Sequence, residues 1–156
     1  MNSPKIIRIL DICISSFALL ILFPLMFLIY WIIFIENKSP LFLQKRVGKN
    51  LKDFKLFKFR TMDIRTKSCP THLVDTSKIS TFGKFLRKSK LDELPQFWNV
   101  LKGDMSLVGP RPCLFIQEDL INLRKEFKID RVKPGITGLA QIKGIDMSNP
   151  NLLVKT

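Results

Sequence analysis

The residues of this sequence best suited to chemistry are two adjacent carboxylates, Asp92 and Glu93. A carboxylate can act as a nucleophile, and a pair can hold a divalent cation through one oxygen while another oxygen reacts. Two neighbouring negative charges repel each other, and a helix expected to begin near Pro95, together with Arg87, would offset that repulsion. Taken alone, such a pair is most often a solvated feature of a helix start, so its significance depends on its surroundings.

An arginine between two prolines is the second candidate. Arg111 lies between Pro110 and Pro112 and follows a glycine. Because proline restricts the backbone, the guanidinium is held in place and could bind a phosphate through two parallel hydrogen bonds. The alternative interpretation is a turn with an exposed arginine.

Residues 131–141 form a third pattern. They contain two glycines and Thr137 with basic residues on the flank. Such a segment could bind phosphate through backbone amides. Many Pro-Gly turns share this pattern without that function.

The element that must position these residues first is a long apolar segment. Residues 12–35 carry no charged side chain. This uncharged segment is longer than the apolar core of a signal peptide, which has about 7–15 residues. As a straight helix the segment would be about 36 Å long, enough to cross about 30 Å of hydrocarbon. A buried helix of a soluble protein is the alternative.

A proline and the flanking charges predict the path of this segment. Pro24 lies near its middle, so a bend is expected there, and each half would be about 18 Å long and too short to cross. Lys5 and Arg8 precede the segment, while Lys38 and Lys45 follow it. Basic flanks favour the cytoplasmic side of a membrane, so we expect a re-entrant helix rather than a spanning one.

The remaining sequence predicts a small, mostly helical domain with short strands. The fold class is therefore α+β, with residues 1–38 as the membrane anchor and residues 39–156 as a cytosolic catalytic domain. The near-alternation of apolar and basic side chains at 54–60 predicts a strand with one solvated face. We further expect a strand at 41–44, a polar loop at 63–80, helices beginning near 79 and 95 and covering 115–127, a strand at 136–142, and a helix end at Gly103.

Charge and composition limit the function classes. The net charge is +13, from 26 basic and 13 acidic side chains, and the pI is about 10.0. Such a surface favours nucleic acid, anionic lipid or phosphorylated substrates. A nucleic-acid binder would leave the acidic pair beside Arg111 without a purpose, so no nucleic-acid partner is expected. An odd number of widely spaced cysteines without a metal-ligand pattern predicts a reducing, cytosolic setting without disulfides: Cys13, Cys69 and Cys113.

Taken in order, these segments resemble the bacterial sugar transferase family, the monotopic polyprenyl-phosphate phosphoglycosyl transferases. The resemblance runs from about residue 8 to residue 144. The matching pieces are Arg8-Ile9-Leu10-Asp11, Pro24, Gln44-Lys45-Arg46-Val47-Gly48, Lys58-Phe59-Arg60-Thr61-Met62, Leu91-Asp92-Glu93-Leu94-Pro95-Gln96, and the runs 103–112 and 133–141.

The resemblance implies a two-step reaction at the cytosolic side of the bacterial inner membrane. A carboxylate attacks the β-phosphate of a UDP sugar and UMP leaves. A polyprenyl phosphate then takes the phosphosugar from the enzyme, which begins the synthesis of a surface polysaccharide or glycoconjugate. Carried over to this sequence, Asp92 is the nucleophile, and Glu93 helps to hold Mg²⁺ or handles the proton of the acceptor.

The resemblance also implies roles for other residues. The expected partners are a UDP sugar, a polyprenyl phosphate and membrane lipid. The membrane helix, broken at Pro24, would begin with Arg8 and Asp11. The expected phosphate contacts are Arg87, Arg111, Lys58 and Arg60, and the expected nucleotide or sugar contacts are Thr137, Gly138 and Gln141.

The sequence differs from the usual family pattern in three respects. Phe23 stands where relatives often have serine, and residues 143–146 replace an Asn-Gly-Arg sequence. The family usually continues with an acidic, tyrosine-containing segment, whereas this sequence stops at Thr156, so the C-terminal part of the family domain is expected to be missing. The alternative function is a catalytically inactive, membrane-anchored relative that acts as a binding or scaffold protein.

Overall fold

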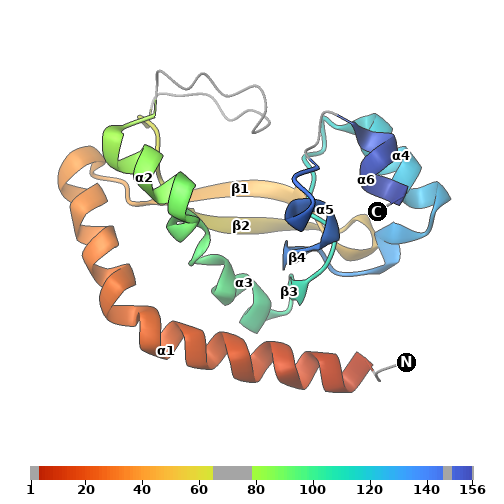
Figure 1. The fold of residues 1–156 in the computed structure, drawn as a ribbon, viewed down its shortest axis with the longest axis horizontal. Helices are drawn as coiled ribbons and strands as arrows, with labels where there is room; N and C mark the ends of the chain where they lie inside the picture. Colours follow the sequence, from red (N-terminus) through yellow and green to blue (C-terminus); the bar gives the residue numbers. More distant parts are fainter. Residues whose placement is uncertain (1–3, 65–78, 146–148, 156) are drawn as a thin grey trace.

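The computed structural model describes residues 4–64, 79–145 and 149–155, and its architecture is α+β as predicted (Figure 1). A long apolar helix lies against a smaller domain of short helices and strands. The loop predicted at 63–80 falls almost wholly outside the described residues, as does Cys69. The helices are α1 (Pro4–Asn37), α2 (Thr81–Ser89), α3 (Gln96–Lys102), α4 (Glu118–Glu126), α5 (Leu139–Ile142) and α6 (Pro150–Lys155). The strands are β1 (Leu41–Val47), β2 (Asp53–Phe59), β3 (Ser106–Val108) and β4 (Gly135–Thr137), and the 3-10 turns are η1 (Lys49–Leu51), η4 (Leu91–Glu93) and η5 (Ile129–Arg131).

The helix α1 contains Pro24 and bends, so that both of its arms lie along the rest of the molecule (Figure 1). Proline removes one backbone hydrogen bond and crowds the preceding turn, which is a usual cause of such a bend. The helix stays continuous through the proline instead of breaking there. Among the described residues, α1 is the one helix long and apolar enough to cross a membrane. Its insertion and its re-entrant path remain predictions.

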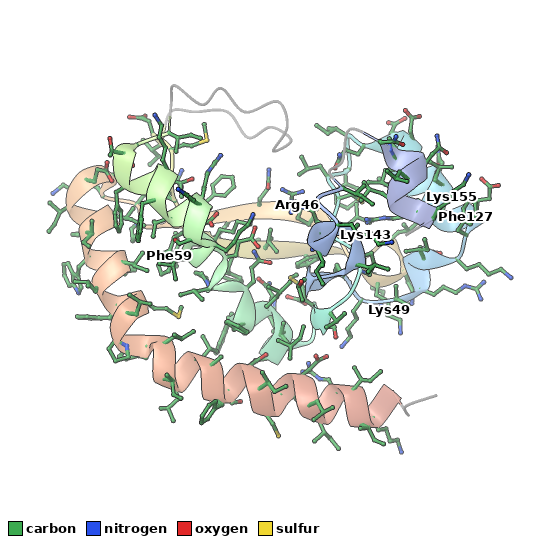
Figure 2. The ribbon with its side chains drawn as sticks, in the orientation of Figure 1. Arg46, Lys49, Phe59, Phe127, Lys143 and Lys155 are labelled. Carbon is green, nitrogen blue, oxygen red and sulfur yellow. The ribbon has the colours of Figure 1, made fainter. Side chains whose placement is uncertain are left out.

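The second arm of α1 is attached to the domain by an apolar cluster. Ile29 and Ile33 pack against Phe59 of β2 and Leu86 of α2, and all four side chains are buried. Phe59 is labelled in Figure 2, at the end of the hairpin nearest to this arm. Burial of large aliphatic side chains of this kind stabilises by roughly 1.5–3 kcal/mol each. The packing fixes the direction in which α1 leaves the hairpin.

The strands β1 and β2 form an antiparallel hairpin with two different faces. The register pairs Leu41 with Phe59 and Leu43 with Phe57, which places these apolar side chains on one face. The opposite face carries Gln44, Arg46 and Lys58 together with the buried Phe54 and Leu56. The strand predicted at 54–60 is thus confirmed as β2, but its two lysines, Lys55 and Lys58, lie on opposite faces.

The helix α3 is fixed to the free edge of β2 by one buried amide. The Asn99 side chain accepts a hydrogen bond from the backbone of Phe57 (3.0 Å) and donates one to the carbonyl of Lys55 (2.7 Å). It thereby satisfies two edge groups that would otherwise lack partners. Gly103 ends α3 in a left-handed conformation (φ 94°), as predicted.

The strands β3 and β4 form a short parallel pair that joins two distant segments. A Cβ atom on Gly135 would lie 2.1 Å from the amide nitrogen of Gly109, so the approach requires glycine. The strand predicted at 136–142 is wrong beyond Thr137, because Gly138 is the extended residue that precedes α5 and the good helix formers that follow it make that helix. The helix predicted at 115–127 is confirmed as the shorter α4, and the one predicted near 79 begins at Thr81.

Candidate functional site

The two adjacent carboxylates lie in η4, a single 3-10 turn between α2 and α3. Lys90 adopts a left-handed conformation (φ 61°) that ends α2 and redirects the chain into this turn. Asp92 is 7% exposed. The sequence therefore predicted correctly that the pair precedes a helix, but a solvated pair is excluded by its burial.

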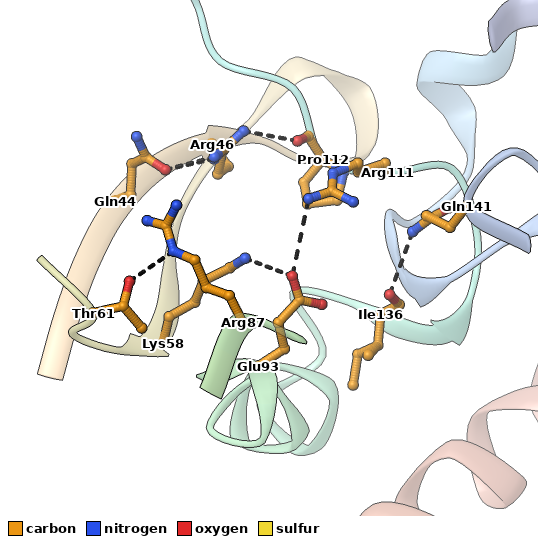
Figure 3. Close-up of polar contacts among 10 residues, drawn as sticks. All are labelled: Gln44, Arg46, Lys58, Thr61, Arg87, Glu93, Arg111, Pro112, Ile136 and Gln141. Carbon is orange, nitrogen blue, oxygen red and sulfur yellow. Dashed lines mark hydrogen bonds and ion pairs between the residues drawn. The ribbon is translucent and has the colours of Figure 1, made fainter. Parts of the chain in front are cut away.

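Glu93 is held by two cations from distant parts of the chain (Figure 3). Its Oε1 atom accepts a hydrogen bond from the ammonium of Lys58 at 2.7 Å, and the guanidinium of Arg111 lies 3.9 Å away. Burial would raise the pKa of this carboxyl, but the charge and hydrogen bond of Lys58, followed by the charge of Arg111, hold the pKa below its usual value. Glu93 is therefore ionised at neutral pH.

Asp92 differs from its neighbour in both contacts and acidity. Its carboxylate makes no hydrogen bond or ion pair within the described part of the chain. Burial raises its pKa above the usual value, the charge of Glu93 adds to this, and Lys58 and Arg87 oppose it. A less acidic carboxylate that no donor occupies is the better nucleophile of the two.

Arg111 is positioned by two further arginines. The buried guanidinium of Arg46 donates to Oε1 of Gln44 at 3.0 Å and 2.5 Å and to the carbonyl of Pro112 at 3.1 Å. Arg124 donates to the carbonyl of Arg111 at 2.7 Å. The turn is thus fixed by contacts as well as by its prolines, and burial, with the nearby charge of Arg111, lowers the pKa of Arg46 to about 10.

Of the other predicted phosphate contacts, one approaches the carboxylates and one does not. The Nε atom of Arg87 donates to the hydroxyl of Thr61 at 2.8 Å, and its charge is near enough to affect Asp92. Arg60 instead donates to the backbone carbonyls of Ser39 at 2.9 Å and Leu41 at 3.2 Å. These bonds hold the Arg60 guanidinium between the end of α1 and the start of β1, and its predicted phosphate contact stays a prediction.

The predicted nucleotide or sugar contacts fall into three different places. Gln141 lines the same small pocket as Glu93 and Arg111, and its amide donates to the carbonyl of Ile136 at 3.3 Å. Its Oε1 atom is buried and has no hydrogen-bond partner among the residues that the structure describes. Thr137 is exposed, and Gly138 packs so closely on the Gly109 carbonyl that a Cβ atom would lie 2.3 Å from it. Gly138 is thus needed for chain packing.

The small pocket has about 10 Å³ of free volume, which is about the space of one water molecule. Any ligand larger than a water molecule must therefore lie over its mouth or enter after the walls move. The polar side chains that line it come from β1, β2, η4, α3, the 109–112 turn and α5: Arg46, Lys58, Glu93, Gln96, Arg111 and Gln141.

Arg8 and Asp11, predicted for the start of the membrane helix, both contact the domain. The Arg8 guanidinium donates to the carbonyls of Val100 (2.5 Å) and Leu101 (2.6 Å) at the end of α3. The buried carboxylate of Asp11 accepts from the Ser106 hydroxyl (2.8 Å) and the backbone amide of Leu107 (3.0 Å). These bonds attach the first arm of α1 to β3, which leads to Arg111.

The donor chemistry of the carboxylates allows a magnesium ion under one condition. No group of three potential metal ligands occurs among the described residues. Mg²⁺ is commonly held by one or two carboxylates together with substrate phosphates and waters. Asp92 and Glu93 fit that pattern if the phosphates of a substrate complete the coordination.

Comparison with known proteins gives a consistent result. The family model for "Bacterial sugar transferase" matches residues 3–153. A "UDP-N-acetylgalactosamine-undecaprenyl-phosphate N-acetylgalactosaminephosphotransferase" of Aeromonas hydrophila is 40% identical over 140 residues, which cover 86% of this chain and 33% of that protein. A "UDP-glucose:undecaprenyl-phosphate glucose-1-phosphate transferase" of Klebsiella pneumoniae is 40% identical over 144 residues, which cover 88% and 30%.

A shorter relative is matched over more of its length. The "Exopolysaccharide production protein ExoY" of Sinorhizobium fredii is 37% identical over 155 residues, and the match covers 88% of this chain and 68% of that protein. The chain thus spans about a third of the length of the two longer relatives.

Proposed function

The chain belongs to the bacterial sugar transferase family, and from this premise we propose that it transfers a sugar 1-phosphate from a UDP sugar to a polyprenyl phosphate. The reaction takes place at the cytosolic face of the bacterial inner membrane, where it begins the assembly of a surface polysaccharide or glycoconjugate. The names of the Aeromonas and Klebsiella relatives give a UDP sugar and undecaprenyl phosphate as the substrates of those proteins. The observation that supports the proposal here is the unequal pair of carboxylates among cations, with Asp92 buried and Glu93 half-buried.

The two steps use the inequality between Asp92 and Glu93. A carboxylate oxygen of Asp92 attacks the β-phosphorus of the UDP sugar, an O–P bond forms, and the bond to the departing UMP breaks. A phosphate oxygen of the polyprenyl phosphate then attacks the same phosphorus. The bond to Asp92 breaks, the carboxylate is regenerated, and the sugar phosphate is joined to the lipid as a diphosphate.

The cations around the pair suit a phosphoryl transfer. Its transition state spreads negative charge over the phosphoryl oxygens, so positioning and charge neutralisation supply most of the rate. Arg111 is fixed beside Glu93, and Arg87 lies near Asp92. Lys58 keeps Glu93 ionised and Asp92 less protonated than burial alone would allow. A bound Mg²⁺ would further offset the charge of the diphosphate.

Release of UMP tests this proposal. The protein is purified in detergent and incubated with Mg²⁺, undecaprenyl phosphate and a panel of UDP sugars, beside an Asp92→Asn variant. Asp119→Asn is the matched control because Asp119 is an exposed aspartate of α4. We expect UMP release with at least one sugar, unchanged in Asp119→Asn and lost in Asp92→Asn. An inactive scaffold would bind the lipid without releasing UMP, and undiminished release in Asp92→Asn would exclude the covalent mechanism.

A further inference from the structure

An apolar groove of about 570 Å³ lies between the bent helix α1 and the apolar face of the hairpin. Its walls come from α1, from both strands and from the start of α3, and almost all of their surface is apolar. Both tryptophans of the sequence line it. The side chains that matter for the argument are Phe23, Phe27, Trp31, Phe57, Pro95 and Trp98.

The groove and the polar site share their walls. In η4 and α3, Glu93 and Gln96 line the polar pocket, whereas Pro95 and Trp98 line the groove. In β2, Lys58 points into the polar pocket, and its neighbour on the opposite face lines the groove. The polar pocket that contains Glu93 and the apolar groove are thus lined by alternate residues of the same chain segments.

This juxtaposition fits one ligand with two chemically different ends. Cations on the polar side suit a phosphate, and an apolar groove on the other side suits a hydrocarbon chain. The volume lies within the range of about 300–1,000 Å³ that is usual for ligand sites, so it can hold a section of a long chain. The groove also opens along α1, whose outer surface is apolar and exposed, so the rest of the chain can continue into a membrane.

We propose that this groove binds the phosphate-proximal isoprene units of the acceptor lipid while its phosphate lies at the polar site. The proposal rests on the proposed function, because that function supplies a polyprenyl phosphate as the ligand. It assigns to Trp98 and Phe57 a role in choosing an acceptor with a long apolar chain over a water-soluble phosphate. Bound in this way, the acceptor phosphate lies beside the carboxylate that carries the phosphosugar.

Tryptophan emission measures the occupancy of the groove directly, since Trp31 and Trp98 are 45% and 55% exposed and can be reached by a quencher. The full chain is placed in nanodiscs of phosphatidylcholine with brominated acyl chains and titrated with undecaprenyl phosphate in the absence of any donor. Bromine quenches tryptophan on contact, so lipid chains in the groove reduce the emission. We expect the tryptophan emission to recover saturably as undecaprenyl phosphate replaces the brominated chains. We expect no recovery with dimethylallyl phosphate, which has the same phosphate group but a single isoprene unit.

A matched pair of variants locates the binding. Trp98→Ala removes part of the groove wall and leaves Trp31 as the reporter. We expect this variant to need about a tenfold higher concentration of undecaprenyl phosphate for half-saturation. Phe127→Ala is the control, because Phe127 is 50% exposed at the end of α4 and lies far from α1 (Figure 2). It should titrate like the unchanged protein.

Three results would overturn the proposal: no recovery, equal recovery with dimethylallyl phosphate, or an unchanged titration of Trp98→Ala. The first would mean that ordinary acyl chains fill the groove. Because no donor is present, these results are independent of catalysis. If the tryptophan emission recovers but no UDP sugar gives UMP release, the groove binds the lipid and the proposed function is refuted. If UMP is released but the emission does not recover, the proposed function stands and the assignment of the groove is refuted.

Discussion

Removal of the buried cation Lys58 offers the sharpest test of how the site is held together. Its ion pair with Glu93 has an N–O distance of 2.7 Å, and the two side chains are 18% and 17% exposed. A Lys58→Met variant leaves the carboxylate buried, with Arg111 at 3.9 Å as the nearest remaining cation. Removal of one partner of a buried ion pair lowers the unfolding free energy by about 3–5 kcal/mol. Because Arg111 still makes a weaker contact with Glu93, we expect a loss near the lower end of this range.

The hairpin contains a matched control for this prediction. Lys45 and Asp53 form an ion pair at 3.6 Å with side chains 71% and 58% exposed. Exposed pairs contribute about 0–1 kcal/mol, so Lys45→Met should change the unfolding free energy by less than 1 kcal/mol. Both variants keep an apolar side chain of similar length, so burial of the charge is the main difference between them.

Denaturant unfolding of the detergent-solubilised protein gives the free energies, and a double variant separates charge from packing. In Lys58→Met with Glu93→Gln, no uncompensated charge remains, so the combined cost should be smaller than the sum by about 0.5–3 kcal/mol. Because the pKa of Glu93 is depressed, the ion pair stabilises the fold above the unfolded-state pKa, near 4.5, and this contribution is lost as the pH falls through the folded-state value. Additive costs, or equal effects of Lys58→Met and Lys45→Met, would refute the reasoning.

Two further outcomes follow from the same geometry. Asp11→Asn should lower the unfolding free energy by about 1.5–3 kcal/mol, because it weakens the hydrogen bonds from Ser106 and Leu107 to a charged acceptor. The variant should also have a lower kcat, because the loss of these bonds displaces Arg111 through β3. A fully active variant of unchanged stability would contradict this prediction. The acid limb of UMP release should lie above pH 3.8, because burial raises the pKa of Asp92 and only the ionised carboxylate attacks. Lys90→Gln removes a charge that lowers this pKa and should move the limb to higher pH, so a limb that does not move would count against Asp92 as the group that titrates.

The sequence predicted the parts of the site that depend on local pattern. The apolar and basic pattern at 54–60 predicted the strand that carries Lys58, the two prolines marked Arg111, and the adjacent carboxylates marked η4. Local pattern does not reveal partners that are distant in the chain, so it missed Arg46, whose bond to Pro112 spans the hairpin and the 109–112 turn. The one available signal was its position two residues from Gln44 on the polar face of β1.

The sequence was also limited where tertiary contacts decide the outcome. Arg60 follows the last residue of β2 and binds the carbonyls of Ser39 and Leu41, around the start of β1, which no local pattern at Arg60 reveals. Asn99 has no unusual context in the sequence, yet it is fully buried and fixes α3 to β2. The apolar groove likewise depends on the bend of α1 against the hairpin, which no local pattern specifies.

In the proposed mechanism, Asp92 carries the phosphosugar between the two steps. The most direct measurement is peptide mass spectrometry of the protein after incubation with Mg²⁺ and the panel of UDP sugars in the absence of any lipid acceptor. We expect a mass increase of one phosphosugar, assigned by fragmentation to Asp92. The increase should be absent from Asp92→Asn and should disappear when undecaprenyl phosphate is added. A phosphosugar on Glu93, or UMP release that requires the acceptor and leaves no modified peptide, would contradict this mechanism.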